Sequence, residues 1–198
     1  MTPRESLEVK ERILQSAQCA FAQHGFDGAT VRQIAEQSNT NQALISYHFG
    51  GKEQLFFALF ECDFPRFSPF EEGDHAVDVL ADVVRKMVNF KWSHPELAKM
   101  MHQEMSMQTC RAGKLKDFFE PLWQRVSKAL QVGKLAGDFD FEDAQTTLGC
   151  VMSVLIFPRE LTVCAAAKEA DAACMNQAIK SSQDFVLRAI GYKPSTGI

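Results

Sequence analysis

The chain is long enough for one domain, or for a small domain and a larger one, and its apolar content excludes gross disorder: 46% of its 198 residues are hydrophobic and 23% are charged. A formal net charge of −4 excludes the strongly basic balance typical of many nucleic-acid-binding proteins, and the first 55 residues carry no excess of basic side chains. Any interaction with nucleic acid must therefore depend on a local surface.

The N-terminal segment predicts a first helix that begins near Pro3. Thr2-Pro3-Arg4-Glu5 has the spacing of a capping box with proline at the first helical position. Apolar residues then recur at helical spacing as far as Phe21. Gly25 can adopt the left-handed conformation that stops this helix, and Phe26 can fold back onto Phe21.

Two shorter helices follow, with a tight turn between them. Thr30-Val31-Arg32-Gln33 is a second capping box, ahead of Ile34 and Ala35 on an inner face. Asn39 tolerates a positive φ and can end this helix. Asn41 or Thr40 can cap a third helix over about residues 42–49, which Gly50-Gly51 interrupts before a fourth helix begins at Lys52.

The rest of the chain predicts a loop and then five more helices. Residues 63–75 mix proline, glycine, acidic residues and phenylalanine, which indicates a loop. A third capping box, Ser93-His94-Pro95-Glu96, precedes one helix, and residues 148–157 are apolar nearly all round, which predicts burial on every face. Strand alternation is absent. The expected helices span about 76–92, 94–109, 114–134, 141–160 and 168–191.

Other signals in the sequence point to a cytoplasmic protein without a metal or cofactor. No apolar run approaches the roughly 18 residues of a membrane span, and the N-terminal residues lack the apolar core of a secretory signal. The cysteines form no Cys-x-x-Cys pair, and no histidine spacing completes a zinc site. We expect most cysteines to be reduced, packed side chains, with redox sensing as the alternative; they are Cys19, Cys62, Cys110, Cys150, Cys164 and Cys174.

The short connection from Asn39 to Asn41 between two helices is helix-turn-helix geometry. In such a unit the first helix crosses the phosphate backbone of DNA, and the second lies in the major groove with its N-terminal side chains at base edges.

Two segments carry a resemblance to the TetR family of bacterial transcriptional regulators: Gly25-Phe26-Asp27-Gly28-Ala29-Thr30-Val31-Arg32-Gln33-Ile34-Ala35 and Leu44-Ile45-Ser46-Tyr47-His48-Phe49-Gly50-Gly51-Lys52-Glu53-Gln54-Leu55. The resemblance covers about residues 10–60. It implies an all-α fold of about nine helices, with a three-helix DNA-binding domain over 1–51 and a helical effector-binding and dimerisation domain over 52–198. Asn39 stands where the family often has glycine and Ser46 where tyrosine is common, which leaves the operator sequence open.

The expected DNA contacts lie on the second and third helices and at the start of the fourth. Tyr47, His48 and Lys52 can converge on backbone phosphates, while Gln42 can pair with adenine and Arg32 with guanine. Ordinary core packing is the alternative for Tyr47 and His48. The full predicted set is Thr30, Arg32, Gln33, Thr40, Asn41, Gln42, Ala43, Ser46, Tyr47, His48 and Lys52.

The C-terminal part is where the resemblance implies dimerisation and effector binding. Helices 141–160 and 168–191 would pair with those of a second copy, because two-fold symmetric operators call for two-fold symmetric proteins; intramolecular core is the alternative. An effector cavity could be lined by methionine and aromatic residues. A stripe of such residues is usually plain core, which we keep as the default; the candidates are Trp92, Met101, His102, Met105, Phe119, Trp123 and Phe157.

The sequence thus predicts a repressor that binds a palindromic operator as a homodimer and is released by an unknown small-molecule effector. The first alternative is an effector-independent DNA-binding structural protein of the same fold. The second is a helical protein–protein interaction module whose DNA-binding domain no longer binds DNA. No nucleophile elbow, phosphate loop, His-Glu-x-x-His motif or convergent carboxylate pair points to an enzyme.

Overall fold

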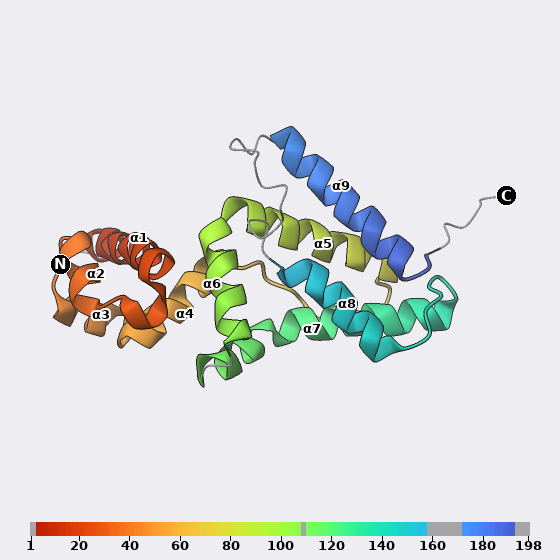
Figure 1. Ribbon diagram of the computed structural model, residues 1–198, viewed down its shortest axis with the longest axis horizontal. Coiled ribbons are helices and arrows are strands. Elements are labelled where there is room, and N and C mark those ends of the chain that lie inside the picture. Colours follow the sequence, from red (N-terminus) through yellow and green to blue (C-terminus); the bar gives the residue numbers. More distant parts are fainter. Residues whose placement is uncertain (1–2, 108–109, 158–171, 193–198) are drawn as a thin grey trace. The chain divides into compact units, whose positions relative to one another are not determined.

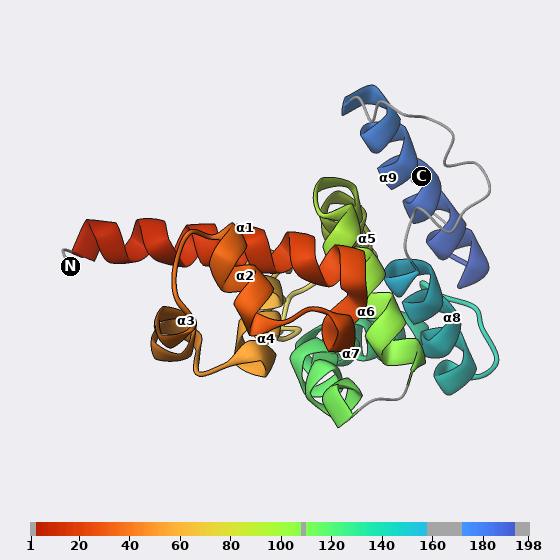
Figure 2. The same cartoon turned by 60° about the vertical axis from the view of Figure 1, so that its left-hand side comes forward.

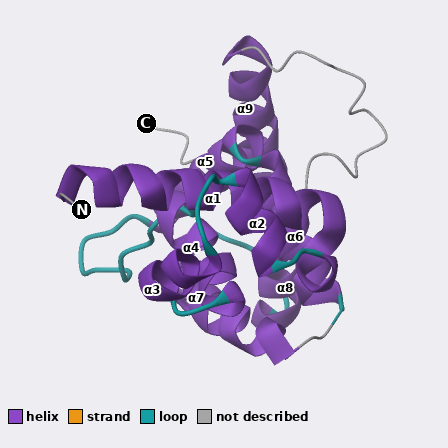
Figure 3. Ribbon diagram, turned by 90° about the vertical axis from the view of Figure 1, so that its left-hand side faces the viewer, coloured by secondary structure: helices purple, strands orange, loops and turns teal. Residues whose placement is uncertain are grey.

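The computed structural model describes residues 3–107, 110–157 and 172–192, and its regular elements in these ranges are all α-helices (Figures 1 and 3). The predicted all-α fold is therefore confirmed. Within the described ranges the helices are α1 (Pro3–Gly28), α2 (Val31–Gln37), α3 (Gln42–Phe49), α4 (Lys52–Asp63), α5 (Ala76–Ser93), α6 (Pro95–Ser106), α7 (Cys110–Ala136), α8 (Ala144–Ile156) and α9 (Ala172–Ala189).

The chain divides into two compact units. The described residues within 1–64 and 99–101 form the first unit, and those within 65–98 and 102–198 form the second. In the first unit α1 packs against α2 and α4, and α3 packs against both α2 and α4 (Figure 2). The domain boundary expected between residues 51 and 52 stays a prediction.

The first unit has an apolar core to which each of its four helices contributes. Phe21 of α1, Ile34 of α2, Ile45 of α3 and Phe56 of α4 are all buried. The Phe21 and Phe56 rings meet edge to face with centroids 5.3 Å apart, an arrangement that aromatic pairs favour. This core fixes the relative placement of α2 and α3.

Gly25 interrupts the first helix where the sequence predicted that glycine would end it. Gly25 has φ 69° and ψ 174°, which are not helical, and α1 as bounded above joins two helical segments across this kink, the second of which ends at Gly28. Phe26 stacks on Phe21 with a centroid distance of 5.7 Å, as the sequence predicted. The capping box expected at Thr2 includes residues outside the described ranges.

The second unit is built around α5, which packs against α7, α8 and α9. Side-chain hydrogen bonds to backbone carbonyls link these helices at several points. Lys91 Nζ of α5 donates to the carbonyl oxygens of Val154 and Phe157 at 3.0 and 3.2 Å, at the end of α8. Gln183 Nε2 of α9 donates to the carbonyl oxygen of Ala81 at 2.8 Å. These donors satisfy carbonyls and fix how α8 and α9 lie on α5.

Two predictions about caps and burial in this unit are wrong. The residue that caps α6 is His94, and its side chain makes no capping hydrogen bond, so the expected capping box at Ser93 is absent. In α8, Cys150 and Ser153 are exposed, and Phe157 just beyond its end is 45% exposed, so the helix is not buried on every face within one chain. Parts of the predicted helices 141–160 and 168–191 lie outside the described residues.

The expectation of packed cysteines is also wrong for the four whose exposure is described. Cys19, Cys62, Cys150 and Cys174 are exposed. At Cys62, partial burial raises the pKa of the thiol, and the neighbouring carboxylates of Asp63 and Glu61 raise it further. A raised pKa lowers the thiolate fraction and hence the reactivity of this thiol. No described helix is long and apolar enough to span a membrane.

Gly133 of α7 allows a close approach between α7 and the chain that follows it. A Cβ at Gly133 would lie 2.1 Å from Cε2 of the buried Phe139. We expect Gly133→Ala to destabilise the protein by about 1–3 kcal/mol, because the ring has to move within a packed core. Gly113→Ala is the matched control in the same helix, where a Cβ meets nothing within 4 Å; it should stabilise by about 0.5–1 kcal/mol. Chemical denaturation measures both, and equal effects would contradict the prediction.

Candidate functional site

The turn between α2 and α3 is fixed by local hydrogen bonds. Thr30 Oγ1 accepts a hydrogen bond from Gln33 N at 3.2 Å, and Gln33 Oε1 accepts one from Thr30 N at 2.9 Å, which completes the predicted capping box. Asn39 has φ 51°, so the residue expected to end α2 does adopt a left-handed conformation. Thr40 N then donates to the carbonyl oxygen of Ala35 at 2.9 Å. The turn is therefore tight and ordered by its own sequence.

A buried serine and an arginine from α1 hold this turn against the rest of the unit. The Ser38 side chain is buried and donates to the carbonyl oxygen of Ile34 at 2.8 Å, and its Oγ lies 2.7 Å from Thr40 Oγ1. Arg12 Nε of α1 donates to the Ser38 carbonyl oxygen at 3.2 Å. These bonds tie the end of α2 to α1, so the start of α3 has a defined direction.

One face of α3 is turned to solvent and carries the residues predicted to contact bases. Asn41 caps the helix through Oδ1, which accepts from Leu44 N at 2.9 Å. With about 100° of rotation per residue, positions 42, 43, 46 and 47 share one arc of about 140° of the helix surface. All four are exposed, and Tyr47 is 79% exposed, whereas Ile45 on the other side is buried. This face of α3 carries mostly polar side chains and is exposed to solvent over two helical turns.

The connection from α3 to α4 places Lys52 at the start of a helix. Gly50 has φ 81° and Gly51 has φ 137°, conformations that strongly favour glycine. Lys52 Nζ lies 4.4 Å from the centroid of the Phe26 ring, which supports the side chain by a cation–π contact. Lys52 is the first residue of α4, a position at which backbone N–H groups also favour an anion.

Two predicted contact residues have other neighbours in the structure. Arg32 Nε donates a hydrogen bond to Glu36 Oε1 at 2.8 Å. This hydrogen bond raises the pKa of the guanidinium, and the negative charge of Glu36 raises it further. His48 is half-buried, and its Nε2 is buried without a hydrogen-bond partner among the described residues. A guanine contact by Arg32 thus competes with Glu36, which an i, i+4 reading of the sequence would have revealed.

The predicted DNA-contact residues fall into two groups by exposure. Seven are exposed and four are half-buried, and all belong to the first compact unit. The exposed ones are Thr30, Arg32, Asn41, Gln42, Ala43, Ser46 and Tyr47, and the half-buried ones are Gln33, Thr40, His48 and Lys52.

Comparison with known proteins identifies the class of this helix-turn-helix. The model of the bacterial regulatory proteins of the tetR family matches residues 13–59, which span the core of α1 through most of α4. A transcriptional repressor of Corynebacterium glutamicum, AcnR, is 27% identical over 149 residues, covering 74% of this chain and 79% of AcnR. The chain belongs to the TetR family of bacterial transcriptional regulators. It is thus a helix-turn-helix transcription regulator, from a family of regulators rather than enzymes.

Further relatives of this TetR-family chain agree with that assignment. The transcriptional repressor NicS of Pseudomonas putida is 32% identical over 112 residues, which covers 53% of this chain and 52% of NicS. Among solved structures, the hemolysin II transcriptional regulator HlyIIR has a TM-score of 0.69 at 24% identity, covering 94% of this chain and 97% of HlyIIR. The fatty acid degradation regulator FadR of Bacillus halodurans has a TM-score of 0.68 at 20% identity, covering 98% and 99%. The two structures show that the fold extends over the whole regulator.

The second unit of the TetR-family chain holds a cavity of about 310 Å³ between α6, α7 and α8. Four residues that the sequence singled out line it: His102, Met105, Trp123 and Phe157. Met101 and Phe119, in contrast, are buried in the core, and Trp92 does not line this cavity. Five further lining residues were not predicted, because no sequence periodicity links side chains from separate helices; they are Ser106, Gly149, Met152, Ser153 and Ile156.

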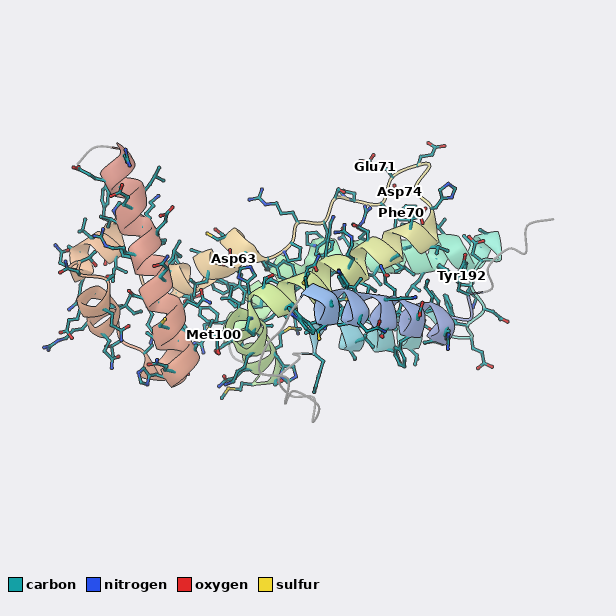
Figure 4. The ribbon with its side chains drawn as sticks, turned by 90° about the horizontal axis from the view of Figure 1, so that it is seen from above. Asp63, Phe70, Glu71, Asp74, Met100 and Tyr192 are labelled. Atoms are coloured by element: carbon teal, nitrogen blue, oxygen red, sulfur yellow. The ribbon has the colours of Figure 1, made fainter. Side chains whose placement is uncertain are left out.

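Arg125 connects the helix that carries Trp123 to the loop between α4 and α5. Its Nη1 donates to the carbonyl oxygens of Ser68 and Pro69 at 2.8 and 2.6 Å, and Nη2 lies 3.6 Å from Asp74 Oδ2. Figure 4 shows Asp74 together with Glu71 and Phe70 on this loop. These contacts hold the loop to α7 at Arg125. Arg125 is two residues along the chain from Trp123, which lines the cavity.

Proposed function

We propose that the protein is a repressor that binds a palindromic operator as a homodimer and releases it when a small molecule binds the second unit. The observation that carries the proposal is the solvent-facing arc of α3. This arc presents chemical groups in the arrangement that a recognition helix offers to the major groove. They are the amide of Gln42, the methyl group of Ala43, the hydroxyl of Ser46 and the phenol of Tyr47. AcnR and NicS are both transcriptional repressors, which supports repression as the direction of regulation here.

In this proposal Gln42, Ala43 and Ser46 read bases, and Tyr47 and Lys52 hold phosphates. Gln42 is exposed in the first turn of α3, where side chains reach base edges in helix-turn-helix proteins. Lys52 is the first residue of α4, so one phosphate would meet both an ammonium and the backbone N–H groups of a helix N-terminus. Such a local site explains how a protein with net charge −4 binds a polyanion.

The proposed dimer face consists of α8 and α9. Phe185 of α9 is 60% exposed in the single chain, and Cys150 of α8 is also exposed. A largely apolar groove of about 280 Å³ runs between the two helices, with both Cys150 and Phe185 in its lining. Exposed apolar surface of this kind marks interaction sites. A second copy packed on α8 and α9 would bury it, and would account for the apolar character of α8 that one chain leaves uncovered.

Release of the operator is proposed to follow from a change in the spacing of the two recognition helices. A dimer on B-DNA places them about 34–36 Å apart. A ligand in the cavity beside Trp123 would favour one placement of α7, and Arg125 would carry that change to the loop after α4. The ligand shifts the equilibrium only by its differential affinity for the two states.

The experiment that tests DNA recognition combines selection of bound fragments from the protein's own genome with affinity measurements on variants. We expect Gln42→Ala to lose about 1–3 kcal/mol of discrimination at one base pair. Lys52→Ala should instead weaken binding to all sequences alike, and reduce by about one the slope of log K against log salt concentration.

Matched controls for these variants lie outside the proposed interface. Gln23→Ala on α1 and Lys128→Ala on α7 remove the same side chains from exposed positions, and both should leave operator affinity and discrimination unchanged. The proposal is wrong if the selected fragments share no palindromic site, or if Gln42→Ala lowers affinity equally for every sequence.

A further inference from the structure

The cavity between α6, α7 and α8 has a lining with a consistent chemical character. It is lined by two aromatic rings, Trp123 and Phe157, and by the thioethers of Met105 and Met152, with Ile156 beside them. Its volume of about 310 Å³ corresponds to roughly ten water molecules at ~30 Å³ each. That is the lower end of the range of small-molecule sites, about 300–1,000 Å³, so a ligand of about two fused rings would fit.

The lining residues supply no formal countercharge for an ion. None of the residues that the structure assigns to this lining is Lys, Arg, Asp or Glu. The two serine hydroxyls already donate within their own helices: Ser106 Oγ to the carbonyl oxygen of His102, and Ser153 Oγ to that of Gly149, both at 2.8 Å. Among the described residues of this lining, an anion or cation would therefore meet apolar side chains and no opposite charge, which favours an uncharged ligand.

His102 is the polar group that distinguishes one end of the cavity. Its ring packs edge to face on Phe157 with centroids 5.3 Å apart, which fixes the imidazole plane beside the aromatic wall. A neutral imidazole offers one N–H donor and one acceptor nitrogen. A hydroxyl group on a ligand matches this pair, because a hydroxyl can either accept from the N–H or donate to the other nitrogen.

We propose that this cavity binds a compact, uncharged aromatic molecule that carries one hydroxyl group, with the ring system against Trp123 and the thioethers and the hydroxyl at His102. This inference rests on the proposed function, because it names the class of effector that would release the operator. It also explains Gly149, at which a Cβ would meet nothing within 4 Å. The absence of a side chain there leaves the space open on the α8 side of the cavity.

The test measures direct binding of three probes by calorimetry to the full-length protein without DNA. The probes are 2-naphthol, 2-naphthoate, which carries a carboxylate in place of the hydroxyl group, and naphthalene, which carries neither. We expect saturable binding of 2-naphthol and at least tenfold weaker binding of 2-naphthoate. His102→Phe should weaken 2-naphthol by about two- to tenfold, the usual worth of one hydrogen bond, and leave naphthalene unchanged.

Filling the cavity provides the matched pair of variants. Gly149→Leu should abolish binding of 2-naphthol, whereas Gly113→Leu should bind it like the wild type, because Gly113 is also a helical glycine with open space around it but does not line the cavity. Thermal unfolding checks that both variants fold. Should Gly149→Leu not fold, Ser153→Leu fills the same cavity from the next turn of α8.

Three results would overturn the inference: 2-naphthoate binding as tightly as 2-naphthol, unchanged binding in the filled variants, or no saturable binding of 2-naphthol at millimolar concentration. Because no DNA is present, these results are separate from the proposed function. Failure of the protein to select a palindromic site would contradict the regulator proposal, whereas a reversed charge preference would contradict only the assignment of ligand class.

Discussion

Replacement of Phe185 by glutamate is expected to convert the protein into a monomer and to lower its affinity for a full operator by about 100-fold or more. The ring is 60% exposed on α9 and lines the groove with α8. In a two-fold symmetric interface each substitution appears twice, so two carboxylates enter one apolar surface without partners. The loss on DNA is large because two linked reading heads gain about 10²–10⁴ in affinity from effective concentration, which a monomer forfeits.

Leu135→Glu is the matched control for this variant. Leu135 is 88% exposed near the end of α7 and does not line the groove between α8 and α9, so the same substitution there adds the same charge to an exposed leucine outside that groove. Light scattering after size exclusion gives the oligomeric state, and fluorescence anisotropy gives affinity for full and half operators. Affinity for a half operator should not change. A dimeric Phe185→Glu protein, or equal disruption by Leu135→Glu, would refute the assignment of the interface.

The sequence predicted the helix-turn-helix well because its signals are local. The capping box at Thr30, the left-handed Asn39 and the cap at Asn41 each depend on residues within four positions along the chain. Their hydrogen bonds form between neighbours, so the pattern alone determines the backbone. The same locality explains why Gly50 could be read as the end of α3.

The sequence predicted the second unit less well because its features depend on contacts between distant segments. The apolar run of α8 gave no means of separating side chains buried within one chain from those, such as Cys150, that one chain leaves exposed. His102, Trp123 and Phe157 lie on different segments, and only the packing of three helices decides which of them border a cavity. The failed cap at Ser93 has a local cause: His94, not Ser93, occupies the capping position before Pro95.

Breaking a buried ion pair between α6 and α7, which no sequence pattern indicated, should strongly lower the stability of the protein. Arg111 of α7 and Glu104 of α6 meet in a bidentate arrangement, with Nε to Oε2 at 2.9 Å and Nη2 to Oε1 at 3.2 Å. Their side chains are 9% and 7% exposed. We expect Arg111→Met to destabilise the protein by about 3–5 kcal/mol, because the buried carboxylate of Glu104 then loses the guanidinium with which it pairs.

The double variant Glu104→Leu/Arg111→Met separates two costs: the cost of burying the ion pair itself, and the cost of leaving one buried ion without the other. Similar apolar volume replacing both ions is often neutral, so we expect the double variant to recover most of the loss in a denaturation cycle. Arg4→Met, which breaks the exposed pair with Glu8, should change stability little. A double variant as unstable as the sum of the single ones would exclude direct coupling. Since Glu104 lies between His102 and Met105 on α6, the single variants should also weaken ligand binding in the cavity, whereas the double variant should restore it.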